Sequence, residues 1–179
     1  TDELHDIEVV DIDGDGLLDV VGRNQDEFNN IGNIIFVYKQ NNPTSWNAPF
    51  QITIPQYGEG LNVSDVDGDG KKDIVVNHYW YKNLNSAGSV NSWSQSQYTS
   101  TFTEKDVYID VGDINKDGRI DIVLSPAELA TETGRSISWF EAPVDRSQIW
   151  PEHTIASGLT AGYHFVGTGD FDVDGDIDV

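Results

Sequence analysis

The stretch DIDGDGLLD at residues 11–19 decides the fold of this chain, because the same pattern returns three times. DVDGDGKKD stands at 65–73, DINKDGRID at 113–121 and DFDVDGDID at 170–178, so the starts lie 54, 48 and 57 residues apart. That spacing is close to the roughly 40 to 50 residues of one four-stranded β-propeller blade and longer than most helical repeats. We therefore predict an all-β propeller segment with one acidic loop in each successive blade.

Each nine-residue copy places oxygen ligands at the spacing that a calcium ion (Ca2+) needs. Side chains at positions 1, 3 and 5 can converge on one point, Gly at position 6 allows a sharp turn, position 7 offers its carbonyl, and position 9 adds a carboxylate. Calcium accepts such a cage of about six to eight hard oxygens, whereas Mg2+ demands tight octahedral geometry and keeps its waters. We predict up to four calcium ions, one per loop.

The predicted ligands follow the same positions in every copy. They are Asp11, Asp13, Asp15, Leu17 and Asp19 in the first loop; Asp65, Asp67, Asp69, Lys71 and Asp73 in the second; Asp113, Asn115, Asp117, Arg119 and Asp121 in the third; and Asp170, Asp172, Asp174, Asp176 and Asp178 in the fourth. Asn115 lowers the charge of the third loop. A turn that binds no metal is the alternative, but crowded carboxylates would repel one another by roughly 1 kcal/mol per pair in water.

The composition agrees with a β-rich, metal-binding chain. The 179 residues carry 31 acids against 10 Lys and Arg, a net charge of -21, which disfavours nucleic acid and anionic membrane surfaces as partners. The chain has no Cys, so disulfides and thiolate sites are excluded. No apolar run reaches the roughly 18 residues of a membrane span, so membrane insertion is not expected.

Apolar alternation predicts a strand before and after each acidic loop, followed by two further strands. The blades are expected at about 3–55, 58–102 and 105–158, with the start of a fourth at about 162–179. The first strand of that fourth blade is predicted at YHFVGTG (163–169), and the fourth strand of the second blade at SQYTSTF (96–102). Because an open array leaves sheet edges uncovered, we expect a fragment of a propeller of roughly seven or eight blades, completed by the same or a neighbouring chain.

The four copies of D-x-[DN]-x-D-G-x-x-D resemble the FG-GAP or VCBS-type repeats of integrin-like, calcium-binding β-propellers. A clear Phe-Gly…Gly-Ala-Pro segment is absent, and residues 139–143 (WFEAP) are instead similar to a strand of microbial secreted members. The resemblance implies an extracellular location, secreted or at the cell surface. It leaves the activity open, because such propellers occur in adhesion ectodomains, lectins, polysaccharide lyases and sugar dehydratases.

A second candidate site lies at the opposite ends of the first strands, where the resemblance implies a channel mouth. His5, Glu59, Asp106 and His164 stand six or seven residues before the loops. They form either a metal or acid–base site, with His5 and His164 as catalytic candidates, or ordinary strand caps, which we favour. The longer connections 23–33 and 125–135 are expected on the same side, where a ligand would bind.

Three functions are compatible with these features. The first is a calcium-stabilised binding module that recognises a glycan or an extracellular protein, as in carbohydrate binding or cell adhesion. The second is the propeller domain of a polysaccharide lyase or sugar dehydratase, which is less favoured because no Ser/His/Asp or Cys/His arrangement is evident. The third is a structural repeat of an extracellular assembly.

Overall fold

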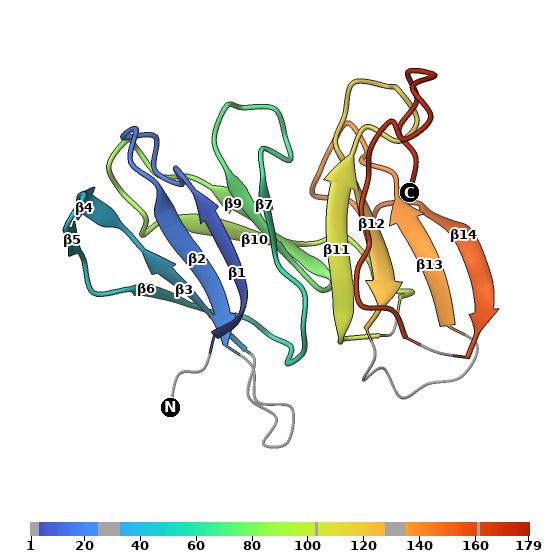
Figure 1. Cartoon of the computed structure of the whole chain (residues 1–179), viewed down its shortest axis with the longest axis horizontal. Helices are drawn as coiled ribbons and strands as arrows, with labels where there is room; N and C mark the ends of the chain where they lie inside the picture. The colour runs from blue at the N-terminus through green and yellow to red at the C-terminus, as the bar shows by residue number, and fades with distance from the viewer. Residues whose placement is uncertain (1–3, 25–32, 103, 128–134, 161) are drawn as a thin grey trace.

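The computed structural model describes residues 4–24, 33–102, 104–127, 135–160 and 162–179, and every regular element in these residues is a β-strand (Figure 1). The strands form antiparallel sheets in which each strand pairs with the one before or after it in the sequence, except where a short hairpin precedes the last strand of the first sheet. The first sheet contains β1 (Leu4–Val10), β2 (Asp19–Asn24), β3 (Ile34–Tyr38) and β6 (Phe50–Thr53); the second β7 (Asn62–Ser64), β8 (Asp73–Val76), β9 (Tyr79–Asn83) and β10 (Trp93–Gln97); the third β11 (Val107–Gly112), β12 (Asp121–Pro126), β13 (Arg135–Phe140) and β14 (Glu152–Leu159). A short hairpin of β4 (Gln40–Asn42) and β5 (Ser45–Trp46) extends the first sheet's outer connection.

The acidic loops all close in the same register. In the three sheets the residue before position 1 pairs with position 9, as Val10 with Asp19, Ser64 with Asp73 and Gly112 with Asp121. The fourth loop repeats this pairing between Gly169 and Asp178, whose backbones exchange two hydrogen bonds. Each loop is therefore the turn of a hairpin, which explains why its nine residues are so regular.

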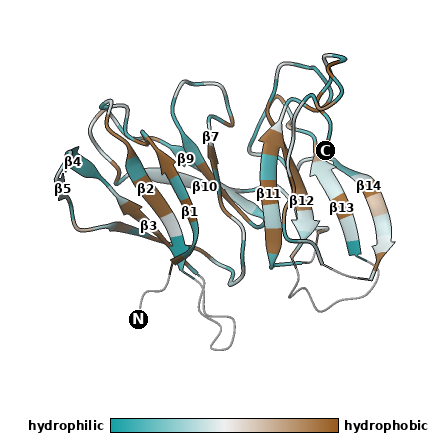
Figure 2. Ribbon diagram, in the orientation of Figure 1, coloured by the Kyte–Doolittle hydropathy of each residue, from teal (hydrophilic) through white to brown (hydrophobic). Residues whose placement is uncertain are grey.

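The second sheet is buried on both faces. Along β8, Ile74 and Val76 join the core shared with the first sheet, whereas Val75 between them joins the core shared with the third. Alternate residues of a strand point to opposite faces, so this short strand contributes to two cores at once. In Figure 2 apolar residues gather in strands such as β1, β2 and β11, and much of the connecting chain is hydrophilic.

The first strands β1, β7 and β11 lie side by side, with the later strands of each sheet farther out (Figure 1). Polar contacts join them: the Gly60 amide donates to Asp6 Oδ2 at 2.9 Å, and Asn62 Nδ2 donates to Asp110 Oδ1 at 3.4 Å. Asp110 also accepts the amide proton of Thr168 at 2.7 Å, which ties the last segment to the third sheet. These contacts join neighbouring sheets at their first strands, so the sheets follow one another in the order of the sequence.

Two strand predictions were wrong. The fourth strand of the second sheet is Trp93–Gln97, because the aromatic residues of SQYTSTF leave the sheet: Tyr98 and Phe102 are buried in the core against the third sheet. The predicted strand 163–169 forms only isolated bridges, at Tyr163 and Gly169. The segment predicted to pair with it forms one bridge among the described residues, between Asp178 and Gly169.

Candidate metal centres

One hydrogen-bond scaffold organises all four acidic loops. The carboxylate at position 1 accepts the backbone amides of positions 5 and 6, which are Asp15 and Gly16, Asp69 and Gly70, Asp117 and Gly118, and Asp174 and Gly175, at 2.9–3.1 Å. Position 3 accepts the amide of position 5 at 3.1–3.3 Å, and position 5 accepts that of position 7 at 2.8–3.0 Å. Each side-chain oxygen keeps lone pairs that these hydrogen bonds do not occupy, so the scaffold orients the oxygens and leaves them able to bind a metal ion.

The backbone turns sharply at two positions of each loop, one of which sequence reasoning missed. Gly at position 6 has φ between +82° and +91°, as its type suggested. Position 4 is also left-handed, and there the residues are Gly14, Gly68, Lys116 and Val173, with φ of +73°, +76°, +59° and +64°. A β-branched residue in this region is strained, so the fourth loop carries a cost that the first two avoid.

We expect Val173→Gly to stabilise the fourth loop. Val173 is 85% exposed, so little packing is lost, and removal of the left-handed strain outweighs the added freedom of the unfolded chain. The Gly175 amide, which donates to Asp170 Oδ2 at 3.0 Å, should exchange its hydrogen roughly two- to five-fold more slowly. The mirror variant Gly68→Val should speed exchange at Gly70, although open space surrounds its new Cβ. Faster exchange in Val173→Gly would contradict this expectation.

The carboxylate at position 9 fastens the loop to the sheet. It accepts the amide of position 2 in all four loops, at 2.9–3.2 Å. It also accepts, each at 2.8 Å, the amide of Asn83 at the end of the third strand and those of Gln40 and Ala142 just beyond the third strand of their sheets. Asp19, Asp73 and Asp121 are fully buried. Burial raises the pKa of the Asp73 carboxyl to about 7, against the lowering effect of the Asn83 amide, and the nearby Asp67 charge raises it further. A cation beside this carboxylate would favour its ionised form.

The loops bring nine of the sixteen predicted side-chain ligands together in three groups. Single carboxylate oxygens lie within 4.8 Å of one another in three groups, which are Asp11, Asp13 and Asp15; Asp65, Asp67 and Asp73; and Asp170, Asp172 and Asp178. In the third loop Asn115 Nδ2 donates to Asp117 Oδ2 at 3.1 Å, and Arg119 forms an ion pair with Asp117. Leu17, Lys71, Arg119 and Asp176 stand at position 7 of their loops, and their carbonyls remain predicted ligands.

Two lysines that sequence reasoning missed reach into these groups. The Lys39 ammonium contacts both Asp13 and Asp15, and that of Lys82 contacts Asp67 and lies 3.0 Å from Asp69 Oδ2. The hydrogen bond from Lys39 holds the pKa of the Asp15 carboxyl below its usual value, and the bond to Asp67 raises the pKa of the Lys82 ammonium. A positive group thus already stands where the oxygens converge, and a hard-oxygen donor set of this kind fits calcium. The shared aromatic–Lys pairs Tyr38-Lys39 and Tyr81-Lys82 are the signal that could have found them.

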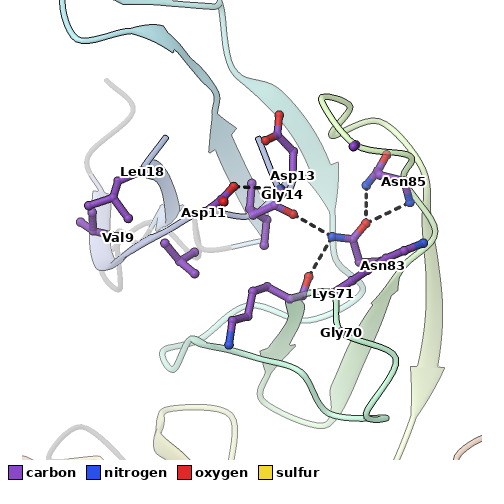
Figure 3. A pocket seen from close by; sticks show the side chains of 13 residues that line it. Val9, Asp11, Asp13, Gly14, Leu18, Gly70, Lys71, Asn83 and Asn85 are labelled. Atoms are coloured by element: carbon purple, nitrogen blue, oxygen red, sulfur yellow. Dashed lines mark hydrogen bonds between the residues drawn. The ribbon is translucent and has the colours of Figure 1, made fainter. Parts of the chain in front are cut away.

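The first two loops line a common cleft of about 570 Å³, and Asn83 bridges them (Figure 3). Asn83 Nδ2 donates to the carbonyls of Ile12 and Lys72, each at 2.9 Å, and the Gly88 amide donates to the Asp13 carbonyl at 3.1 Å. Ordering of one loop is therefore coupled to the backbone of the next.

The second candidate site is only partly assembled. His5 Nε2 lies 4.0 Å from Glu59 Oε1, and His5 Nδ1 lies 3.6 Å from Asp6 Oδ1. His164 is exposed on the segment that follows the bridge at Tyr163. That the four residues His5, Glu59, Asp106 and His164 form one site stays a prediction.

Sequence reasoning missed the buried Arg23 beside this group. Its guanidinium donates to the carbonyls of Gly60 at 3.0 Å and Gln56 at 3.3 Å. Burial lowers the pKa of Arg23 to about 10, while the charges of Asp6, Asp106 and Glu59 oppose that shift. The acids on this side therefore face a fixed positive charge, which favours a structural role for them.

Comparison with known families agrees with the repeat. Residues 6–76 match the family model of the FG-GAP-like repeat, a stretch that contains the first two acidic loops. The resemblance to FG-GAP-type repeats is thus confirmed for that stretch. A search of curated proteins found no match. Among the described residues, none lies in a helix long and apolar enough to cross a membrane.

Proposed function

We propose that this chain, which carries FG-GAP-type repeats over residues 6–76, is a calcium-stabilised β-propeller segment of an extracellular binding module. One observation carries the calcium part: the same hydrogen-bond scaffold converges carboxylate oxygens in loop after loop, and a lysine ammonium is seated among those oxygens in two of them. The ligands are the residues at positions 1, 3, 5, 7 and 9, and bound calcium supplies a shared counter-charge that holds each hairpin turn.

The propeller part is supported by the arrangement of the sheets. Their first strands lie side by side, and the second sheet packs between its two neighbours through apolar faces. Further blades, from this or a neighbouring chain, would cover the outward face of the first sheet, where Ile7 and Val9 are 54% and 59% exposed. Closure of the ring removes such open faces and edges.

Calorimetric titration of the metal-stripped chain tests the calcium proposal. We expect up to four ions to bind, with dissociation constants of about 0.1–1 mM, as in extracellular modules. Mg2+ at equal concentration should compete poorly, because it retains its waters. No binding heat for calcium, or equal affinity for Mg2+, would refute the proposal.

The binding partner that we propose is a glycan or an extracellular protein, held at the side of the sheets away from the acidic loops. Most of the connections 23–33 and 125–135 lies outside the described residues. The described part of this side includes His5 with its neighbours Asp6 and Glu59. A glycan array, probed with and without calcium, tests the proposal; calcium-dependent binding is expected because the metal holds the hairpins rigid. Absence of binding to glycans and to extracellular proteins would favour the purely structural repeat.

A catalytic role, as in a polysaccharide lyase or sugar dehydratase, is the second candidate and rests on the approach of His5 to Glu59. In that case the imidazole would accept a proton next to a sugar carboxylate. The double variant His5→Ala/His164→Ala should then abolish turnover of the uronate polymers tested. Unchanged turnover would exclude this role for the two histidines.

A further inference from the structure

Lys39 and Lys82 occupy equivalent places in the first two sheets. In each sheet the position-9 carboxylate accepts one amide from beyond or at the end of the third strand, and the residue just before that amide is Lys39, Lys82 or Glu141. The side chain at this place leaves the sheet on the side of the acidic loop. The sheet, and not the loop itself, therefore delivers the positive charge to the first two loops.

The two ammonium groups are held by carboxylates at positions 3 and 5 of their loops. Lys39 contacts Asp13 and Asp15, with its side chain only 13% exposed, and Lys82 contacts Asp67 and Asp69 at 31% exposure. These are the same oxygens that calcium would need. An ammonium and a calcium ion cannot share them, because both are positive and each fills the point of convergence.

The third sheet shows that the fold does not require lysine here. The corresponding residue there is Glu141. Its Oε2 lies 3.0 Å from His153 Nε2, and its Oε1 lies 3.8 Å from Arg119 Nη2. The backbone bond from Ala142 to Asp121 is nevertheless as short as its counterparts. A change of charge at this place therefore leaves the hairpin geometry intact.

We propose that Lys39 and Lys82 are tethered counter-cations that calcium must displace, so that each weakens calcium binding by its own loop while shielding the acids when calcium is scarce. This inference rests on the proposed calcium binding. Lys82 has somewhere to move, because it lines a cleft of about 440 Å³ together with Ser94, Ser96 and Asp145. Its release therefore needs only a side-chain rotation, without unfolding of the sheet.

A site-resolved calcium titration tests the proposal. The position-6 glycine amides donate to the position-1 carboxylates, as Gly70 to Asp65 at 2.9 Å, so their NMR signals report each loop separately. In Lys82→Met the Gly70 midpoint should fall roughly three- to twenty-fold in calcium concentration, because the neutral side chain no longer competes. The Gly118 midpoint should stay where it is in the unaltered chain.

Lys72→Met is the matched control. It removes the same charge beside the second loop, from a residue of that loop, but Lys72 is exposed and has no ion pair with the described acids. Its Gly70 midpoint should shift less than about two-fold, through long-range charge alone. If Lys82→Met does not fold, Lys39→Met read at Gly16 makes the same test in the first loop.

The outcomes separate the two proposals. Equal Gly70 midpoints for Lys82→Met and Lys72→Met would overturn the role of Lys82 while leaving calcium binding intact. If no glycine amide of the unaltered chain moves at about 10 mM calcium, the proposed calcium function itself fails. An independent readout uses the unaltered chain: the rate of amine labelling at Lys39 and Lys82, relative to Lys72, should rise severalfold with calcium. A ratio that ignores calcium would overturn the displacement.

Discussion

Calcium at 10 mM will raise the free energy of unfolding by roughly 1.4–2.7 kcal/mol for each loop that binds it, relative to the chain in EGTA, given dissociation constants of about 0.1–1 mM. The gain arises because the folded chain gathers the ligands, as in the group of Asp65, Asp67 and Asp73, whereas the unfolded chain does not. For a domain of this size the expected rise in melting temperature is about 3–10 °C per loop.

Thermal unfolding followed by circular dichroism measures this effect. Mg2+ at the same ionic strength is the control, because it screens charge without filling the cage. Proteolysis gives a second readout, since cleavage at the acidic loops should slow when calcium is added. A melting curve that is indifferent to both EGTA and calcium would contradict the central proposal.

Asp73→Ala will destabilise the chain by about 2–6 kcal/mol in EGTA, before any loss of metal binding. Asp73 is fully buried and accepts the amides of Val66 at 3.2 Å and Asn83 at 2.8 Å. Its removal leaves two buried donors without a partner, at about 1–3 kcal/mol each. Urea unfolding at neutral pH provides the measurement, with the midpoint and slope compared with those of the unaltered chain.

Asp69→Ala is the matched control for this variant. Asp69 belongs to the same loop, accepts the Lys71 amide at 3.0 Å and lies 3.0 Å from the Lys82 ammonium. Asp69 and Lys71 are exposed and the Lys82 side chain is 31% exposed, so water replaces the lost interactions. We expect a loss below about 1 kcal/mol in EGTA. Equal destabilisation by the two variants would mean that the two amides of the buried carboxylate contribute little, contrary to our reading of position 9.

Together these effects separate two roles of the acidic loops. The buried carboxylate at position 9 joins the loop to the third strand even without metal, and in the first two loops the carboxylates at positions 3 and 5 hold a cation. In the first two loops that cation is a lysine ammonium until calcium replaces it, under the displacement that we propose. Under the proposed calcium binding, the metal would strengthen hairpins that the backbone has already formed.

The amino-acid sequence by itself determined the parts of this protein that depend on near neighbours. The scaffold bonds of each loop join residues two to seven positions apart, so the nine-residue pattern contains all that they require. The alternating apolar strands on either side of the first three loops were predicted correctly for the same reason, because strand periodicity is local. The strand predicted at 96–102 was wrong, because Tyr98 and Phe102 are drawn into a core whose other half comes from the third sheet.

Only the tertiary structure decided which side chains from distant parts of the sequence contact the acidic loops and the first strands. Lys39 reaches Asp13 across 26 residues, Lys82 reaches Asp67 across 15, and Arg23 donates to the Gly60 carbonyl across 37. From the sequence alone, a lysine in or next to a strand is expected to be an ordinary exposed residue, because the register of the sheet is not known. The physical reason is that charge interactions depend on distance in space, and here the antiparallel pairing of the third strand with the second brings the ammonium to the carboxylates.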